Sequence, residues 1–537
     1  MKYFSLLVAA LLLVSCGGSA ENESSANLSP IMKKALYDKG SLFYADFENY
    51  PKDKSQLPIG VFDSGTGGLT VLERLLELDR FNNITGEPGA DGILDFEGED
   101  FSYLADQANM PYGNYSSEKK DDYLKELVVK DALALLSSKY AENSTEHQNP
   151  KGVKKPVKII VIACNTATSY GLQDISTLLE LSGTGVKVIG VVNAGVNAFL
   201  DFVSDTLKEN ATPAPQSGEI AVGVLATVGT IASGAYERTM GELQKERLEA
   251  KEAAHTTAGE VLLPYAGKIN VVNYGAAGFA ESVDMEPDFV NRSLKETRES
   301  YRGPKLGEGE NDIKPELLPI YNFHFGNSDV LYKKSGNEYT EIQLNSAANY
   351  ARFHLVSLFE KYRQSGNTAK MKAVILGCTH YPFLLDTLKQ VMSELAEVKV
   401  GDNYLYRDII APDFTFIDPA IYTAIECYNS LRQDKLLALK TTDTKLDAYI
   451  SVPAYGLPFE KIDNEGNLTY DFKYGREVGT EDVTTLFVPF SRRYINSDNL
   501  KRIEARLPYS YKLINETQRN RTKGRPRWGD LGLLWEF

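Results

Sequence analysis

The sequence predicts an α/β protein made of two similar, doubly wound domains with mostly parallel sheets and a ligand site in the cleft between them. From about residue 58, apolar strands alternate with helical segments, which is typical of parallel sheets covered by helices. The run "VKIIVIAC" (157–164) is apolar without alternation, as expected for a strand buried on both faces. A second run, "MKAVILGC" (371–378), also ends in a small residue, a cysteine and polar residues, so the two halves look related.

The first domain is expected over 58–211. Its predicted strands are 58–62, 101–106, 157–164 and 186–192. Helical periodicity predicts helices over 69–78 and 118–140, the second with Ser116 or Ser117 as N-cap. The segment 212–218, "TPAPQSG", reads as a linker.

The second domain is expected over 219–400, with an irregular polar insertion at about 284–340. Its predicted strands are 219–227, 268–274, 372–378 and 414–418, the last of which lies where the chain returns to the first domain over 401–431. The remainder, 432–537, is predicted to be an extension of unknown role, in which 449–459 and 484–494 are candidate strands or edge pieces.

Length and charge narrow the class of protein. A chain of 537 residues is too long for one core, because single cores stop growing near ~250–300 residues. The net charge is −15 and no basic patch is interleaved with aromatic residues, so a nucleic-acid partner is not expected.

The N-terminus predicts export. Lys2 precedes the apolar run "YFSLLVAALLLV", which is too short to span a bilayer and is typical of a signal peptide, here 1–15. "LVSC" followed by two glycines looks like a bacterial lipoprotein box, so Cys16 is the predicted lipidation site and 16–57 a tether. The protein is then expected in the cell envelope, on the periplasmic or outer-surface side. The alternative is an ordinary secretory signal with a chance cysteine.

Four small polar loops follow predicted strands and precede helices. They are "DSGTGG" (63–68), "CNTATS" (164–169), "ATVGT" (226–230) and "CTHYP" (378–382). Ligands of open α/β sheets bind at the carboxyl ends of strands, and helix N-termini attract anions such as carboxylates. Singly, each residue has a simpler explanation: a buried cysteine, a capping Asp63, a core His380. Together, with no Lys or Arg among them, the loops predict a carboxylate site built from oriented dipoles and short donors.

Five stretches occur in a fixed order: "GVFDSGTGGLTVL" (60–72), "PYG" (111–113), "ACNTATS" (163–169), "GTIASGAY" (229–236) and "LGCTHYPFL" (376–384). This set resembles the motifs of the aspartate/glutamate racemase family, and most closely those of its glutamate racemases. The resemblance spans about 58–430 and extends to "FIDPA" (416–420). It implies two α/β domains around one active site, no pyridoxal phosphate or other cofactor, and no metal.

The resemblance also implies roles for individual residues. Cys164 and Cys378 would be the two acid/base groups on opposite faces of the substrate Cα, with Asp63 assisting Cys164 and His380 assisting Cys378. Such thiols must be partly ionised, which a helix N-terminus and a hydrogen-bonding neighbour favour. The residues that match substrate-binding positions are Asp63, Ser64, Pro111, Tyr112, Gly113, Asn165, Thr166, Thr227, Thr230, Thr379 and His380.

Some features depart from the family. "GVVNAGVNA" (190–198) has Asn193 and Ala194 where an acidic residue and a proline are usual, and "NYGAAGFAESVD" (273–284) lacks a Cys-Pro step. The family is normally cytoplasmic, whereas this chain is predicted to carry an export signal. The sequence therefore predicts a glutamate racemase that supplies D-amino acid for peptidoglycan, with three alternatives: an aspartate racemase, a non-catalytic amino-acid-binding lipoprotein, or a protein silenced by a Cys164–Cys378 disulfide. The oligomeric state is left open, a homodimer being one possibility.

Overall fold

The computed structural model describes residues 28–146, 150–208, 218–250, 254–255, 260–309, 311–438, 443–480, 483–491, 494–495 and 497–522. The expected signal peptide, Cys16 and the tether up to residue 27 lie outside the described residues, as does the linker 212–218 apart from its last residue. Within the described ranges, no helix combines the length and apolar character that a membrane crossing requires.

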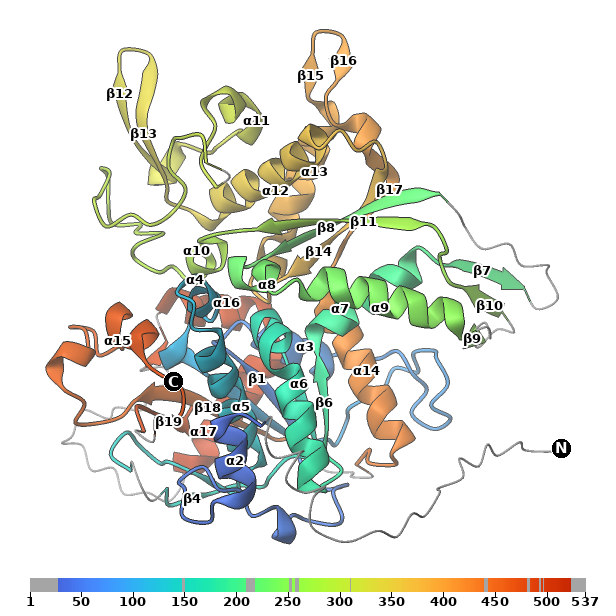
Figure 1. Ribbon diagram of the computed structural model, residues 1–537, viewed down its shortest axis with the longest axis vertical. Coiled ribbons are helices and arrows are strands. Elements are labelled where there is room, and N and C mark those ends of the chain that lie inside the picture. Colours follow the sequence, from blue (N-terminus) through green and yellow to red (C-terminus); the bar gives the residue numbers. More distant parts are fainter. Residues whose placement is uncertain are drawn as a thin grey trace, which may run out of the picture.

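Two separate sheets form the lower and upper domains of the molecule (Figure 1). The lower sheet has six strands, all parallel except β19 at one edge. In spatial order they are β19 (Thr485–Pro489), β18 (Leu446–Pro453), β2 (Phe101–Ala105), β1 (Ile59–Asp63), β5 (Ile159–Ile162) and β6 (Lys187–Gly190). Every residue of β1, β2 and β5 is buried, so the unalternating apolar pattern does mark strands covered on both faces.

Helices cover both faces of the lower sheet. One core contains residues of α2 (Pro30–Tyr37), α5 (Asp121–Leu136) and α6 (Asn165–Ser182). The opposite core contains residues of α3 (Leu69–Leu76), α14 (Pro419–Gln433), α16 (Ser497–Arg506) and α17 (Pro508–Thr522). The return segment and the end of the chain therefore complete the first domain.

The upper sheet has four parallel strands in the order β11 (Lys268–Gly275), β8 (Glu219–Ala226), β14 (Lys370–Gly377) and β17 (Ile410–Ile417). Its helices are α10 (Phe279–Val283), α12 (Ala347–Gln364) and α13 (Leu385–Glu397) on one face, and α7 (Val191–Phe202) and α9 (Ala235–Glu249) on the other. The predicted doubly wound, mostly parallel two-domain fold is confirmed.

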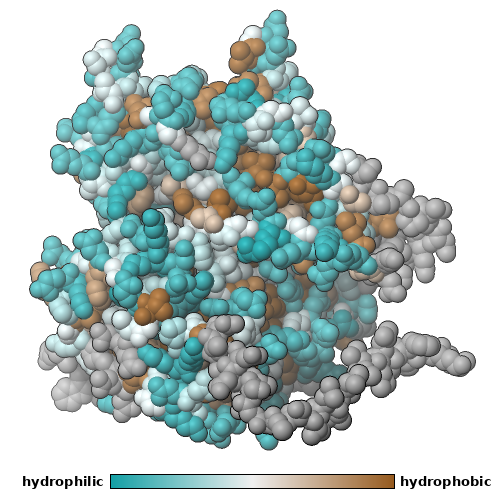
Figure 2. Space-filling view, in the orientation of Figure 1, coloured by the Kyte–Doolittle hydropathy of each residue, from teal (hydrophilic) through white to brown (hydrophobic). Residues whose placement is uncertain are grey.

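Smaller elements decorate this frame. Two hairpins stand apart as projections at the top of the upper domain (Figures 1 and 2). They are β12 (Val330–Ser335) with β13 (Glu338–Leu344), and β15 (Lys399–Val400) with β16 (Asn403–Tyr404). The remaining elements are β3 (Lys139–Tyr140), β4 (Gly152–Val153), β7 (Asp205–Lys208), β9 (Ala254–His255), β10 (Glu260–Leu263), α4 (Gly113–Ser117), α8 (Val228–Ala232), α11 (Leu318–Tyr321) and α15 (Tyr470–Gly475).

Two expectations need correction. The predicted strand 186–192 ends at Gly190, and Val191 already begins α7, whose apolar residues pack on the upper sheet. Ser116 and Ser117 do not cap the long helix: they end α4, and α5 begins at Asp121. The sequence left the role of the segment after 432 open, and the structure joins it to the first domain, because β18 pairs with β2 over Leu446–Ile450.

The candidate strand 449–459 thus corresponds to β18, which is an interior strand, whereas 484–494 contains the edge strand β19. The physical reason is burial: Leu446, Ala448, Ile450 and Val452 of β18 all join the lower core. Burial of Leu446, Ile450 or Val452 contributes about 1.5–3 kcal/mol each, which favours an interior position for this strand.

Candidate active site

The predicted site residues lie at the carboxyl ends of parallel strands of both sheets. Asp63 ends β1 and Ser64 follows it, and Cys164, Asn165 and Thr166 follow β5 in the lower sheet. In the upper sheet, Thr227 and Thr230 follow β8, and Cys378, Thr379 and His380 follow β14. This is the edge at which α/β proteins bind ligands, and here the two edges meet.

Cys164 occupies the N-terminus of the long helix α6. Its Sγ accepts a hydrogen bond from the backbone N–H of Ala167 at 3.4 Å and donates one to Ser64 Oγ at 3.6 Å. Burial raises the pKa of the Cys164 thiol, and the nearby Asp63 carboxyl contributes to the same shift. In the resting site Cys164 is therefore a protonated thiol, able to donate a proton.

Asp63 lies beside Cys164 and is 1% exposed. Its Oδ2 accepts a 2.6 Å hydrogen bond from the backbone N–H of Gly68, which closes the 63–68 loop. Burial raises the pKa of Asp63, and this effect outweighs the opposing influence of His380. The carboxyl group is thus held close to the thiol in an environment that favours proton uptake.

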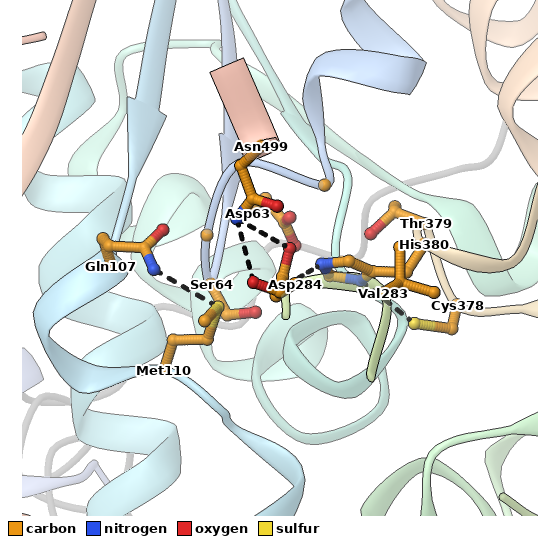
Figure 3. Close-up of polar contacts among 12 residues, drawn as sticks. Asp63, Ser64, Gln107, Met110, Val283, Asp284, Cys378, Thr379, His380 and Asn499 are labelled. Atoms are coloured by element: carbon orange, nitrogen blue, oxygen red, sulfur yellow. Dashed lines mark hydrogen bonds and ion pairs between the residues drawn. The ribbon is translucent and has the colours of Figure 1, made fainter. Parts of the chain in front are cut away.

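Cys378 faces a histidine that is paired with a carboxylate. The Sγ of Cys378 lies 3.4 Å from Nδ1 of His380, and Nε2 of His380 lies 2.8 Å from Oδ2 of Asp284 (Figure 3). Burial opposes a charge on the imidazole, but Asp284 and then Cys378 raise the pKa of His380 well above its usual value. A doubly protonated ring in this position forms an ion pair with the Asp284 carboxylate through its Nε2 edge and directs its Nδ1–H at the Cys378 sulfur.

The 63–68 loop connects the two cysteines. Ser64 contacts Cys164, while at the other end of the loop a Cβ added to Gly67 would lie 2.6 Å from Thr379 Oγ1 and 2.7 Å from His380 Cε1. The absence of a side chain at Gly67 is what allows this loop of the lower domain to approach the Cys378 loop of the upper domain.

Three threonine hydroxyl groups form a triangle across the domain interface. Thr166 Oγ1 lies 3.0 Å from both Thr227 Oγ1 and Thr230 Oγ1, which are themselves 3.0 Å apart. Asn165 also bridges the domains, since its Oδ1 accepts a 2.6 Å hydrogen bond from the Tyr236 hydroxyl. These short donors, beside the N-terminus of α6, are suited to a carboxylate ligand.

Two glycines set the closest approach of the domains. A Cβ on Gly229 would lie 2.9 Å from the Cα and 3.0 Å from the carbonyl oxygen of Gly113. Because both neighbours are backbone atoms, Gly229→Ala must push the domains apart. We expect kcat/KM to fall roughly 10–100-fold, as misplaced catalytic groups do, with the far-UV circular dichroism spectrum preserved.

The matched control for this prediction is Gly241→Ala in α9, where an added Cβ meets nothing within 4 Å. That change should leave kcat/KM unaltered and stabilise the helix by up to about 1 kcal/mol. Equal kinetics for the Gly229 and Gly241 variants would show that the approach of the two domains is not critical.

The Tyr112 side chain does not line the site. It is 1% exposed, and its hydroxyl oxygen lies 2.5 Å from Asp106 Oδ2 and 2.7 Å from Asp131 Oδ2, in the lower core. Gly113 of the same motif approaches Thr227 of the upper domain. Because the Tyr112 phenol satisfies two buried carboxyl groups, a substrate contact of Tyr112 would be made by its backbone, and the role of the 111–113 motif in substrate binding stays a prediction.

These two carboxyl groups permit a test of their protonation. The single phenolic proton can be donated to only one carboxylate, so one of the two acids is protonated. Burial raises the pKa of Asp131 well above its usual value, and the nearby Asp106 contributes to the same shift. The stabilisation from this proton is complete below the ordinary pKa of about 3.9 and is lost as pH rises through the raised value. In acid, the free energy of unfolding of Asp131→Asn should therefore lie within about 1 kcal/mol of that of the parent. As pH rises, the variant should become more stable relative to the parent.

Urea unfolding at several pH values measures this difference, and Asp122→Asn on the exposed side of α5 is the control. A large loss of stability in Asp131→Asn at every pH would instead mean that a charged Asp131 is needed.

The structure adds site residues that the sequence analysis missed. Asp284 pairs with His380, and Asn499 and Arg502 of α16 contact Asp284. Arg502 brings a positive charge next to loops in which the sequence has no Lys or Arg. The only available signal was the acidic pair Glu281 and Asp284 after the predicted strand 268–274; nothing in the sequence indicated α16.

Cys164, Cys378 and Cys427 are all free thiols in the structure. Cys427 is buried in the lower core on α14, away from the loops of the site. Among the described residues, no group of three or more His, Cys, Asp or Glu side chains is arranged to hold a metal ion. The arrangement places the buried side chains of Cys164 and Cys378 beside Ser64 and His380 respectively, which is suited to taking a proton from one carbon and returning another.

Comparisons with known proteins agree on one family. The chain is 30% identical over 342 residues to a glutamate racemase of Oceanobacillus iheyensis, covering 64% of this chain and 73% of the relative. It is 25% identical over 385 residues to a glutamate racemase of Carboxydothermus hydrogenoformans, covering 72% and 84%. A glutamate racemase crystal structure from Bacillus anthracis matches with 20% identity and a TM-score of 0.39 over 73% of this chain and 88% of that one. No protein-family model matches the chain.

Proposed function

Because this chain belongs to the aspartate/glutamate racemase family and is an amino-acid racemase, we propose that it interconverts L- and D-glutamate with Cys164 and Cys378 as the two acid/base groups. The observation that carries the proposal is the position of the thiols. Each follows the carboxyl end of a strand, β5 or β14, in one of two facing sheets. The 63–68 loop contacts Cys164 through Ser64, and through Gly67 it approaches Thr379 and His380, which follow Cys378.

Inversion of a carbon requires a base on one face and an acid on the other. In the proposed mechanism Cys378 acts as the base in one direction, because the charged His380 faces its sulfur, and Cys164 supplies a proton from its thiol. Cys378 removes the Cα proton of one enantiomer and Cys164 protonates the opposite face. The enzyme is then left with a thiol at Cys378 and a thiolate at Cys164, which is the state that acts on the product enantiomer.

The carbanion formed on the way needs its carboxylate held by preorganised donors. The hydroxyl groups of Thr166, Thr227 and Thr230 and the N-terminus of α6 supply such donors on both domains. Ser64, Asn165 and Thr379 add further donors next to the thiols. No cofactor takes part in this scheme.

The test uses L-glutamate and L-aspartate separately in D2O with the reduced, unlipidated protein. Loss of the Cα–H signal of L-glutamate by NMR, with appearance of D-glutamate, is the expected result. Exchange with L-aspartate and not with L-glutamate would identify aspartate as the substrate. The two amino acids differ by one methylene, which changes binding in a pocket by only ~1–3 kcal/mol. No exchange with either, together with binding of one of them, would favour a binding protein of the same fold.

We also propose that the protein is a lipoprotein of the cell envelope, anchored through Cys16, and that it supplies or recycles D-glutamate for peptidoglycan there. The support is the sequence "LVSC" after a short apolar run. Membrane fractionation of the parent and of Cys16→Ser tests this proposal: the variant should leave the membrane fraction, and an unchanged distribution would exclude the anchor.

A further inference from the structure

The last two helices of the chain connect the two domains beside the site. Helix α17 is fixed to the lower domain by Glu73 of α3, which is 3% exposed. The two carboxylate oxygens of Glu73 accept hydrogen bonds from the backbone N–H groups of Tyr509 and Ser510 at 2.9 and 2.8 Å, and from the Ser510 hydroxyl at 2.7 Å. Since α16 ends at Arg506 and α17 begins at Pro508, this anchor also holds α16 in place.

Helix α16 reaches the upper domain through two side chains. Asn499 Nδ2 lies 3.3 Å from the carbonyl oxygen and 3.4 Å from Oδ1 of Asp284. Arg502 Nη2 lies 3.3 Å from the same Oδ1, and its Nη1 donates to the carbonyl oxygen of Val283. The Arg502 guanidinium also packs 5.1 Å from the centre of the Phe383 ring. Figure 3 shows Asn499 reaching from above to Asp284, on the side away from His380.

The two oxygens of Asp284 are divided between two tasks. Oδ2 pairs with His380, whereas Oδ1 faces Asn499 and Arg502. A carboxylate engaged on both oxygens has little freedom to rotate, so the imidazole that it orients stays directed at the Cys378 sulfur, 3.4 Å away. We infer that Asn499 and Arg502 are positioning residues for racemisation, which act through Asp284 and His380 on Cys378; this inference rests on the proposed function.

The charges around His380 make Arg502 the important member of the pair. Burial tends to raise the pKa of Asp284. The positive charges of His380 and, to a smaller extent, Arg502 have the opposite effect, and the net result is a lowered pKa. The titratable and charged groups that influence His380 or Asp284 include Asp63, Tyr103, Glu281, Glu286, Cys378 and Arg502. Because Arg502 lowers the pKa of Asp284, its removal favours protonation of the carboxyl group that orients His380 toward the Cys378 sulfur.

The experiment compares Arg502→Gln with Arg506→Gln, an exposed arginine on the same helix. For Arg502→Gln we expect kcat/KM to fall roughly tenfold, a part of the ~10²–10⁴ that a general acid–base group supplies, and the acid limb of its pH profile to move to higher pH. Arg506→Gln should match the parent. Arg502→Lys should recover part of the loss, because it restores the charge without the forked geometry.

A structural role for Arg502 predicts a different result. The Haldane relation for a racemase requires kcat/KM to change equally for both enantiomers, but kcat alone is free to differ between them. Partial unfolding lowers kcat equally in both directions and leaves KM unchanged. Positioning of Cys378 alone instead lowers kcat unequally for L- and D-glutamate, and equal losses with an unshifted pH profile would overturn the inference.

A second readout does not depend on activity. The rate at which iodoacetamide alkylates Cys378 at neutral pH, measured by peptide mass spectrometry relative to Cys164 in the same sample, should fall several-fold in Arg502→Gln and not in Arg506→Gln. If the parent racemises neither glutamate nor aspartate, the proposed function fails while this readout still tests the role of Arg502. An unchanged ratio of the two alkylation rates would remove that role whatever the parent does.

Discussion

We expect the proposed racemisation of glutamate to be lost when either Cys164 or Cys378 is replaced by alanine. A general acid–base group contributes typically about 10²–10⁴-fold, and inversion needs both groups in one turnover, so we expect the loss in each variant to be at least at the upper end of this range. Both thiols are buried in the site, at 7% and 6% exposure, so solvent is poorly placed to substitute for either.

Each variant keeps one of the two cysteines as a base and should therefore still exchange the Cα proton without inverting the carbon. In D2O the remaining cysteine can remove a Cα proton from one face and return a deuteron to the same face. The Cys378 variant and the Cys164 variant should thus exchange the Cα–H of opposite enantiomers without inverting them. Proton NMR of each enantiomer with each variant measures this, and the buried Cys427→Ala variant is the control for removal of a thiol outside the site.

Retained racemisation in both cysteine variants would refute the two-thiol mechanism. Exchange of the same enantiomer by both variants would contradict the placement of the thiols on opposite faces. Loss of all exchange with native stability would mean that each thiol depends on the other for its protonation state, as coupled sites do.

The second large effect concerns stability. Lys158 Nζ is fully buried and lies 2.5 Å from Glu99 Oε2, with the carbonyl oxygens of Ser55 and Leu436 at 3.1 and 2.8 Å. Lys158→Met removes the buried ammonium group that lies against the Glu99 carboxylate. We expect the free energy of unfolding to fall by about 3–5 kcal/mol, the usual cost of breaking a buried pair by removing one partner.

The control is Lys187→Met, which breaks a partly exposed pair with Asp434 and should cost less than about 1 kcal/mol. Adding Glu99→Gln to Lys158→Met removes the buried negative charge of Glu99 and should recover part of the loss. Urea unfolding followed by circular dichroism measures all three variants. A loss for Lys158→Met no larger than that for Lys187→Met would show that water reaches Glu99 when the lysine is gone.

Much of the fold could be read from local patterns. The predicted strands 58–62, 101–106, 157–164, 219–227, 268–274, 372–378 and 414–418 correspond to β1, β2, β5, β8, β11, β14 and β17, with ends shifted by a few residues. Continuous apolar runs indicate burial on both faces directly, so such strands can be predicted without knowing which strands lie next to them. Errors arose where a strand passes straight into a helix, as at Gly190, or where a polar residue near a helix is not its cap, as at Ser116.

The sequence by itself determined that small polar loops with two cysteines follow strands in two related halves, because strand burial and loop composition are local properties. Only the tertiary structure decided the partners of these residues. It brought Asp284 to His380, turned the Tyr112 phenol into the lower core, inserted β18 beside β2, and placed Asn499 and Arg502 on Asp284. These contacts join segments that are far apart in the chain, and long-range packing, rather than the periodicity of any one segment, selects them.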